Sequence, residues 1–401
     1  MLSLLCIALG AFAIGTEGFM LAGLLPAIAA DVGVSISVAG QLVTVFSLTY
    51  ALASPLLAVA TGEVDRKRLL MASMSVFALG NVLAATAHGY GALLAARIVL
   101  ALAASTFMPA ASAYAAATAT PERRGRALSI IYVGLTMSTV VGVPLGVLVG
   151  QRFGWRSTFV GVFFLAVLAV AGIWRVLSPA PAGQTATLSE RLAVARRPEV
   201  LGVLVQTALA LAGAFTVYTY LAPFLGRAAG LAGPGLAVVL FLFGGAGALG
   251  NLLGGTAADR VSLRRLLSAV FAAMAIIFAL LSTAAELLPP SAGLVVVAVL
   301  LLWGVVGWSF PSIQQTRLVG IDARLAPVTL SLNASATYLG ISLGAVLGSM
   351  AVSHGRVLAI GWLAAGCELL GLAVLRLLPY RAQARPEAPV AGARFRAPDV
   401  G

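Results

Sequence analysis

Residues 294–303 read Leu-Val-Val-Val-Ala-Val-Leu-Leu-Leu-Trp, an unbroken succession of apolar side chains. A strand of a membrane β-barrel shows a different pattern, because its side chains alternate between lipid and a polar lumen. Lipid offers no hydrogen-bond partner to the backbone, so a chain inside it must form helices or a closed barrel. The run therefore predicts a membrane-spanning helix, which needs about 20 mostly apolar residues.

Similar apolar segments occur along nearly the whole chain. The twelve predicted spans are residues 3–28, 38–60, 68–87, 91–117, 126–149, 157–177, 200–225, 235–257, 264–284, 292–315, 327–351 and 358–378. The chain is 61% hydrophobic and 9% charged, whereas an ordinary soluble domain carries about 25% charged residues. This composition excludes a water-soluble fold and predicts an all-α membrane protein with twelve transmembrane helices.

The formal net charge of +12 follows membrane topology and does not indicate nucleic-acid binding. With the N-terminus in the cytoplasm, 20 of the 25 basic residues fall on the cytoplasmic side, four on the other side, and Arg97 within a span. Cytoplasmic connections of membrane proteins carry such an excess of Lys and Arg. We therefore expect a lipid bilayer around the chain, both termini in the cytoplasm, and no nucleic-acid partner.

A polar segment divides the spans six and six. We predict an N-terminal six-helix bundle over 1–177, a cytoplasmic linker over 178–199, a C-terminal six-helix bundle over 200–378 and a disordered cytoplasmic tail over 379–401. Within the linker, Ser189-Glu190-Arg191 is expected to begin a short interfacial helix whose arginines contact anionic lipid.

Three matches at a single offset indicate an internal repeat. The pattern Gly-x-x-Leu-Gly-x-x-x-Gly at residues 142–150 recurs at residues 340–348, an offset of 340 − 142 = 198. Arg126 matches Arg324, and Thr61 matches Asp259, at the same offset. Two parallel repeats that rock about a site near the midplane are one plan of membrane transporters. The repeat therefore favours a transporter, built as two pseudo-symmetric halves, over a receptor or a membrane enzyme.

The connection after the eighth span carries a recognisable motif. Residues 255–265 read Gly-Thr-Ala-Ala-Asp-Arg-Val-Ser-Leu-Arg-Arg, which resembles the loop motif Gly-x-x-x-Asp-Arg-x-Gly-Arg-Arg/Lys of the major facilitator superfamily. The match places Gly255, Asp259 and Arg260 at motif positions. Gly255 would allow a close helix approach, and Asp259 would cap or pair across a helix end. A simple positive anchor at the membrane surface is the alternative reading.

The corresponding connection of the first half departs from this motif. Thr61 stands where the family has Asp, and Asp65 or Glu63, beside Arg66, would have to replace it. The gating role that the resemblance implies for this connection is therefore open.

The fifth span presents a face of small residues. Gly142, Gly146 and Gly150 share one helix face because they are spaced four apart, and Pro144 removes a backbone donor and allows a bend. The pattern is similar to the Gly/Pro-rich motif of drug:proton antiporters in the same superfamily. Ordinary packing of small residues would give the same face, so this alternative stays open.

Two charged residues within spans are the candidates for proton coupling. Arg97 resembles the family's membrane arginine, which is linked to that role. An arginine in the bilayer costs at least about 2.5–3.5 kcal/mol, so it should face the interior and have a partner, unless it snorkels outward. Glu17 lies midway through the first span, where low dielectric favours the protonated carboxyl. It would accept a proton, pair with Arg97, bind a cationic substrate, or be structural. Glu368 is a third membrane acid.

Polar and aromatic side chains within spans are candidates for a substrate cavity. They are Tyr50, Tyr114, Gln206, Tyr218, Trp308, Gln314, Asn333 and Tyr338. Buried amides and hydroxyls need partners, which substrate, cavity water or a neighbouring helix would supply.

The segments 14–31 and 153–159 resemble one branch of the antiporters, which includes chloramphenicol, sugar and nucleoside exporters. The resemblance implies a proton-coupled efflux antiporter for a small organic molecule, monomeric, in a bacterial inner membrane, and we expect no cofactor or metal. An importer or uniporter is the first alternative. A membrane enzyme is the second, although the chain has only two histidines, His88 and His354, and lacks an Asp-rich metal motif and a nucleotide-binding glycine loop.

Overall fold

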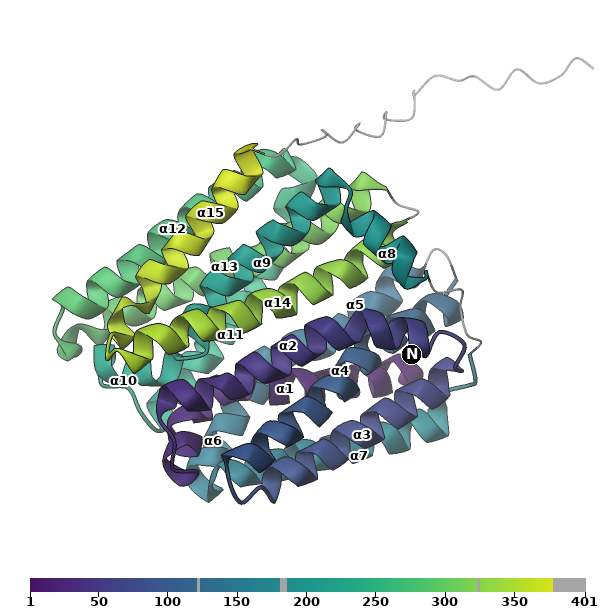
Figure 1. Ribbon diagram of the computed structural model, residues 1–401, viewed down its shortest axis with the longest axis horizontal. Helices are drawn as coiled ribbons and strands as arrows, with labels where there is room; N and C mark the ends of the chain where they lie inside the picture. Colours follow the sequence, from purple (N-terminus) through teal and green to yellow (C-terminus); the bar gives the residue numbers. More distant parts are fainter. Residues whose placement is uncertain (121–122, 181–185, 323–324, 378–401) are drawn as a thin grey trace, which may run out of the picture.

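The computed structural model describes residues 1–120, 123–180, 186–322 and 325–377, in which every regular element is a helix or helical turn (Figure 1). The first half contains α1 (Leu2–Asp31), α2 (Ile36–Ala60), α3 (Arg66–Ala85), α4 (Tyr90–Thr118), α5 (Arg124–Met137), the π turn η2 (Ser138–Gly142), α6 (Val143–Phe153) and α7 (Trp155–Val176). The linker holds α8 (Leu188–Ala195). The second half contains α9 (Pro198–Tyr218), α10 (Leu221–Ala229), α11 (Pro234–Arg260), α12 (Leu263–Leu287), η3 (Pro290–Ala292), α13 (Gly293–Ile321), α14 (Ala326–Ser353), η5 (Val357–Ala359) and α15 (Ile360–Leu377).

Twelve helical spans in the described residues are long and apolar enough to cross a membrane. The elements α5, η2 and α6 together make the fifth span. The two halves form two bundles, one drawn from purple through blue to teal and the other from teal through green to yellow (Figure 1). The predicted all-α fold with twelve spans is confirmed, while the tail predicted over 379–401 lies outside the described residues.

The seventh span differs from its prediction over 200–225. Helix α9 ends at Tyr218, and a new short helix, α10, begins at Leu221. Pro223 explains the break, because its nitrogen carries no hydrogen for the carbonyl of Thr219, four residues earlier. The chain therefore turns at Thr219 and Tyr220, which brings the Tyr220 ring into the core.

Capping side chains define several helix starts. Ser35 caps α2 and Asp65 caps α3, each accepting the backbone N–H of the residue three positions later. Thr187 and Glu190 form a reciprocal capping box at the start of α8. These side chains bind N–H groups that have no partner within the helix. The short helix expected from Ser189 thus begins one residue before it.

The fifth span changes its hydrogen-bond pattern just before Pro144. An α-helix would pair residue 144 with the carbonyl of Val140, but proline has no N–H to donate. The segment forms a π turn instead, and the N–H of Val143 donates to the carbonyl of Ser138. The bend expected from Pro144 therefore takes the form of a π turn, a feature that often marks functional positions.

The repeated glycine faces pack against the first helix of their own half. A side chain added at Gly142 would meet Thr16 of α1, and one added at Gly340 of α14 would meet the carbonyl of Ala208 in α9. Gly146 and Gly150 face Met20 and Leu24 of α1 in the same way. The same helices therefore pair in each half, as a duplicated unit requires.

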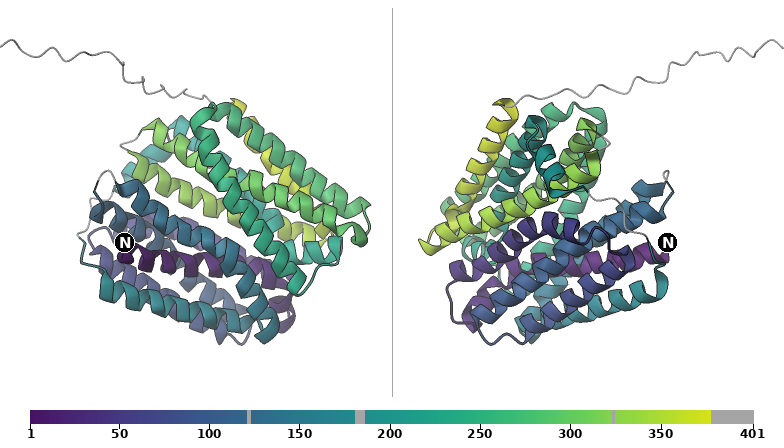
Figure 2. Two further views of the ribbon diagram at one scale, coloured as in Figure 1. Left: turned by 180° about the vertical axis from the view of Figure 1, so that it is seen from behind. Right: turned by 45° about the vertical axis from the view of Figure 1, so that its right-hand side comes forward.

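The two halves are joined at the end that holds the α1–α2 connection, which we call the far end. There Ser349 of α14 donates to the carbonyl of Ser37 in α2 at 3.1 Å and accepts from Gln41 at 3.4 Å. Close contacts between α11 and the fifth span involve η2 and α6. The ribbons converge at this end and diverge toward the opposite end, which holds the N-terminus and α8 (Figure 2, right). We call that opposite end the linker end.

Candidate functional site

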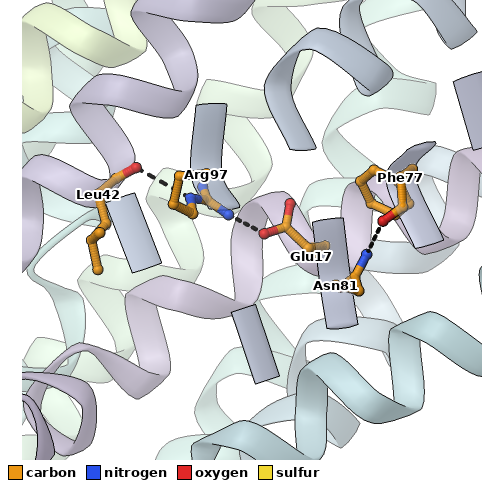
Figure 3. Close-up of polar contacts among 5 residues, drawn as sticks. All are labelled: Glu17, Leu42, Phe77, Asn81 and Arg97. Carbon is orange, nitrogen blue, oxygen red and sulfur yellow. Dashed lines mark hydrogen bonds and ion pairs between the residues drawn. The ribbon is translucent and has the colours of Figure 1, made fainter. Parts of the chain in front are cut away.

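Glu17 and Arg97 form an ion pair inside the first half (Figure 3). Glu17 projects from α1 and Arg97 from α4, and both side chains are 0% exposed. The Arg97 Nε also donates to the backbone carbonyl of Leu42 in α2 at 3.2 Å. The structure thus brings together the two residues that sequence selected for proton coupling, and it buries Arg97 rather than letting it snorkel outward.

This pair retains unused hydrogen-bonding capacity. Glu17 Oε2 and Arg97 Nη2 have no hydrogen-bond partner among the described residues, although both are buried. Buried polar atoms of this kind usually bind water or a ligand. A side chain added at Gly18, next to Glu17, would meet no described atom within 4 Å. Open space therefore adjoins α1 at Gly18, one residue from Glu17.

An aromatic group connects the ion pair to the second half. The Arg97 guanidinium lies 4.2 Å from the centroid of the Phe46 ring in α2. Phe46 in turn contacts Tyr338 of α14, with ring centroids 6.3 Å apart. Tyr338 stacks on Tyr50 of α2 at 3.6 Å between centroids and 19° between planes. Two of the predicted cavity residues, Tyr50 and Tyr338, therefore lie face to face across the interface between the halves.

Tyr132 of α5 belongs to this group, and the sequence analysis missed it. It lies near both Tyr50 and Tyr338, and it is 44% exposed. The available signal was the same as for the other tyrosines, namely a phenol within a predicted span. Its neighbours Ile130, Ile131 and Val133 gave its segment the appearance of a lipid-facing helix.

A second aromatic cluster lies beside α1 in the second half. Tyr218 contacts Phe19 of α1, Phe215, Phe243 and Trp303, with ring centroids 6.2, 5.3, 6.0 and 6.5 Å away. Phe215, which stands 198 residues after Glu17, contacts Phe19 at 6.1 Å. The second half therefore places apolar rings where the first half places its carboxyl group. Predicted residue Trp308 instead packs against Gly247 between α13 and α11.

The predicted amide residues of the second half make two separate sets of buried hydrogen bonds. The Thr207 hydroxyl donates to Asn333 Oδ1 at 2.8 Å, and Gln314 Nε2 donates to Thr207 Oγ1 at 3.4 Å. Arg317 donates to Gln206 Oε1 at 2.7 Å. Arg317 is one of the 20 basic residues that the sequence places on the cytoplasmic side, and it is only 8% exposed. The Gln206 and Gln314 side chains are 0% exposed, so they do not line an open space in this conformation.

The first-half connection binds the linker. Asp65 Oδ2 accepts the N–H of Ala180 at 2.9 Å, and the N–H of Arg66 donates to the Ala180 carbonyl at 3.0 Å. The buried Arg66 side chain also donates to the carbonyl of Gly62 at 3.1 Å. Tyr114 of α4 is buried at the same end and interacts with the Ser178 backbone. These contacts fasten the start of the linker to the first half.

The second-half motif makes fewer contacts. Asp259 and Arg260 are exposed, and a side chain added at Gly255 would meet no described atom within 4 Å. The close helix approach expected at Gly255 occurs instead at Gly250 and Gly254, which lie against the backbone of α13. The reason is helical phase, because residues 250 and 254 share the face of α11 that packs on α13.

Arg191 does not behave as a lipid anchor. It is 7% exposed, and its guanidinium donates to Ser331 of α14 at 3.0 Å and to the Ala186 carbonyl at 3.1 Å. The prediction that this arginine contacts anionic lipid is therefore wrong. Helix α8 packs against α14, and Arg191 lies on the packed face, so it binds the second half.

Glu368 is buried between α15 and α9. Its side chain is 2% exposed, lies next to Gly213 of α9, and its Oε1 has no hydrogen-bond partner among the described residues. It is thus separate from the Glu17–Arg97 pair.

Comparison with known proteins identifies the relatives of this chain. A family model described as Major Facilitator Superfamily matches residues 7–345. "Uncharacterized MFS-type transporter YbcL" of Bacillus subtilis (strain 168) is 32% identical over 377 residues, which cover 94% of this chain and 95% of that protein. "Inner membrane transport protein YdhP" of Escherichia coli (strain K12) is 32% identical over 371 residues, which cover 92% and 94%.

Solved structures share the fold. A D-xylose-proton symporter superposes with a TM-score of 0.78 at 15% identity, covering 94% of this chain and 97% of that chain. A bacterial homolog of the human lysosomal transporter Spinster, in an inward-facing and occupied conformation, gives a TM-score of 0.74 at 17% identity, covering 93% and 95%. At these identities the likeness establishes the architecture alone.

Proposed function

The chain belongs to the Major Facilitator Superfamily, and we propose that it is a proton-coupled antiporter that exports a small organic molecule. Its family and its twelve apolar helices make it a multi-pass transporter of the bacterial inner membrane, and its transporter-named relatives point away from an enzyme. The proposal adds to this the direction of transport, the coupling ion and the residues that carry it. We further propose cytoplasmic termini, on the strength of the basic residues at the linker end.

One observation carries the proposal: the buried ion pair between Glu17 and Arg97. A proton that binds Glu17 removes its negative charge and leaves the Arg97 cation in a low-dielectric interior. Loss of one partner of a buried pair costs about 3–5 kcal/mol, a large part of the roughly 5.5 kcal/mol that moves a two-state equilibrium from 1:99 to 99:1. Protonation would therefore change the relative stability of the states open to either side of the membrane.

The packing of the fifth span supports exchange. Its glycine face lies against α1, the helix that carries Glu17, and its π turn lies beside α11 of the second half. A change at Glu17 can therefore alter the position of α1 against the fifth span, and with it the contact between the halves. The small molecule would bind between the halves, near Gly18, Tyr132 and the stacked pair of Tyr50 and Tyr338.

Inside-out vesicles test the proposal. Vesicles that hold an acidic interior are loaded with a pH-sensitive dye, and chloramphenicol, a pentose sugar and a purine nucleoside are added in turn. An exported compound should release protons and restore the dye fluorescence with the wild-type protein. Glu17→Gln should abolish the release, whereas Glu286→Gln, at an exposed glutamate in the last turn of α12, should preserve it. Equal proton release from Glu17→Gln and wild type would exclude Glu17 as the coupling residue. Uptake of a compound into whole cells, driven by a proton gradient directed into the cell, would favour an importer.

A further inference from the structure

Tyr338 is the point at which the second half reaches the charged pair. It belongs to α14, yet its ring stacks on Tyr50 of α2 and contacts Phe46, the residue that lies under the Arg97 guanidinium. The path from Glu17 to the second half therefore consists of one ion pair, one cation–π contact and one ring contact, that between Phe46 and Tyr338. Every residue on it except Tyr338 belongs to the first half.

The charge of Glu17 offsets that of Arg97 while both groups are ionised, because the two side chains form an ion pair. The Arg97 guanidinium also lies over the Phe46 ring, which contacts Tyr338. When Glu17 takes up a proton, only the cation remains, and aromatic rings and phenol oxygens attract a nearby cation. Neutralisation of Glu17 therefore increases the attraction between Arg97 and the aromatic group.

We propose that Tyr338 is the positioning residue that transmits the protonation state of Glu17 to the second half. When Glu17 is charged, the ion pair holds the Arg97 side chain of α4 against α1. The stack of Tyr50 and Tyr338 then keeps α2 against α14. When Glu17 is neutral, Arg97 turns toward the aromatic group and displaces the stack, which loosens α2 from α14. This inference rests on the proposed function, because it takes Glu17 as the proton acceptor.

The surroundings of the pair assign the response to Glu17. Arg97 of α4 is the charged group that acts on Glu17 in the described residues. The other ionisable side chains that face the group are Tyr50 of α2, Tyr132 of α5 and Tyr338 of α14. Phenols stay protonated at neutral pH, with an ordinary pKa of about 10. A conformational change near neutral pH that depends on this group therefore reports the carboxyl of Glu17.

Spin-label distances test the inference without a known substrate. Labels are attached at S129C on α5 and T256C on α11, two exposed positions toward the linker end, after Cys6 and Cys367 are replaced by alanine. The distance distribution is measured by pulsed electron resonance in lipid nanodiscs, between pH about 5 and about 8. The variants are Glu17→Gln, Tyr338→Leu, Tyr338→Phe and Tyr50→Leu, with Phe164→Leu at a lipid-facing ring as the size control.

The expected pattern is specific. Wild type, Tyr338→Phe and Phe164→Leu should change their distance distribution with pH, whereas Glu17→Gln should hold one distribution throughout. Tyr338→Leu should lose the pH response although Glu17 is intact. Tyr50→Leu removes the α2 ring of the stack, so this variant should also lose the pH response. If Tyr338→Leu does not fold, Tyr50→Leu takes its place in the test.

Two other outcomes would overturn the inference in different ways. A wild-type response in Tyr338→Leu or Tyr50→Leu, with Glu17→Gln unresponsive, would reject Tyr338 as transmitter and leave the proposed function intact. If the distance distribution of wild type changed with pH no more than that of Glu17→Gln, both the role of Tyr338 and the proposed role of Glu17 would be rejected. A full pH response in Glu17→Gln would also reject both roles.

Discussion

The ring of Tyr220 lies directly against the backbone of Gly40 at the far end. Tyr220 follows α9 in the second half, and its hydroxyl donates to the carbonyl of Ala345 in α14 at 3.1 Å. Gly40 belongs to α2 of the first half, and a side chain added there would meet the phenol group. The absence of a side chain at residue 40 thus allows the halves to close at this end.

We therefore expect Gly40→Val to favour a state that is open at the far end. Overpacking costs about 1–3 kcal/mol, which changes a two-state equilibrium about 5- to 150-fold. Alkylation of S37C, in protein without Cys6 and Cys367, should become faster by a factor in this range. Gly91→Val is the control, because a side chain at Gly91 meets no described atom within 4 Å. Equal labelling of the Gly40 and Gly91 variants would contradict the packing argument.

The Glu17–Arg97 pair should show strong coupling in a double-mutant cycle. Glu17→Gln and Arg97→Gln each leave one buried charge without its partner, which costs about 3–5 kcal/mol. Two glutamines leave no charge, so the double variant should be more stable than the sum of the single losses predicts. Thermal unfolding midpoints in detergent measure this. Additive losses would mean that the two side chains are not paired in the protein.

Much of the fold follows from the sequence because lipid imposes a simple rule on the backbone. Apolar runs of sufficient length had to be helices, and twelve of them form. Glu17 and Arg97 were also predictable, since a charge in a span requires a partner. The break at Tyr220 follows from Pro223, a signal that the predicted span over 200–225 did not take into account. Sequence did not show the burial of Arg191 and Arg317, because burial depends on how helices pack in three dimensions.

The cavity residues show the same limit. Tyr50 and Tyr338 meet across the halves, whereas Gln206 and Gln314 hydrogen-bond within the second half. All four looked alike in sequence, as polar groups within spans. Hydropathy identifies such a residue but not the direction in which its helix presents it, and Tyr132 was missed for that reason.

Arg191 should hold α8 on the second half. Its hydrogen bond to the Ser331 hydroxyl involves a charged donor, and such bonds contribute about 1.5–3 kcal/mol. Arg191→Ala should therefore raise amide hydrogen exchange in α8 about tenfold or more, because each 1.4 kcal/mol is a factor of ten. Leu192→Ala, at a 49% exposed neighbour, should change exchange little. Unchanged protection of α8 in Arg191→Ala would show that other contacts hold it.

Gly134 determines how closely α5 approaches the helix that carries Glu17. A side chain at this position would meet the carbonyl and Cα of Ala8 in α1, and backbone atoms cannot rotate away as a side-chain tip can. We expect Gly134→Ala to lower the stability by about 1–3 kcal/mol through overpacking and to weaken proton-driven transport, since α1 must shift with Glu17 on it.

The matched control for this substitution is Gly161→Ala on the exposed face of α7, where the added methyl group meets no described atom within 4 Å. Alanine is favoured over glycine within a helix by about 0.5–1 kcal/mol, so this variant should unfold at a higher temperature than wild type. The two Gly→Ala changes should therefore move the unfolding midpoint in opposite directions. If both raised it, α5 and α1 would be farther apart in the membrane than this packing requires, and the coupling route through the fifth span would lose its support.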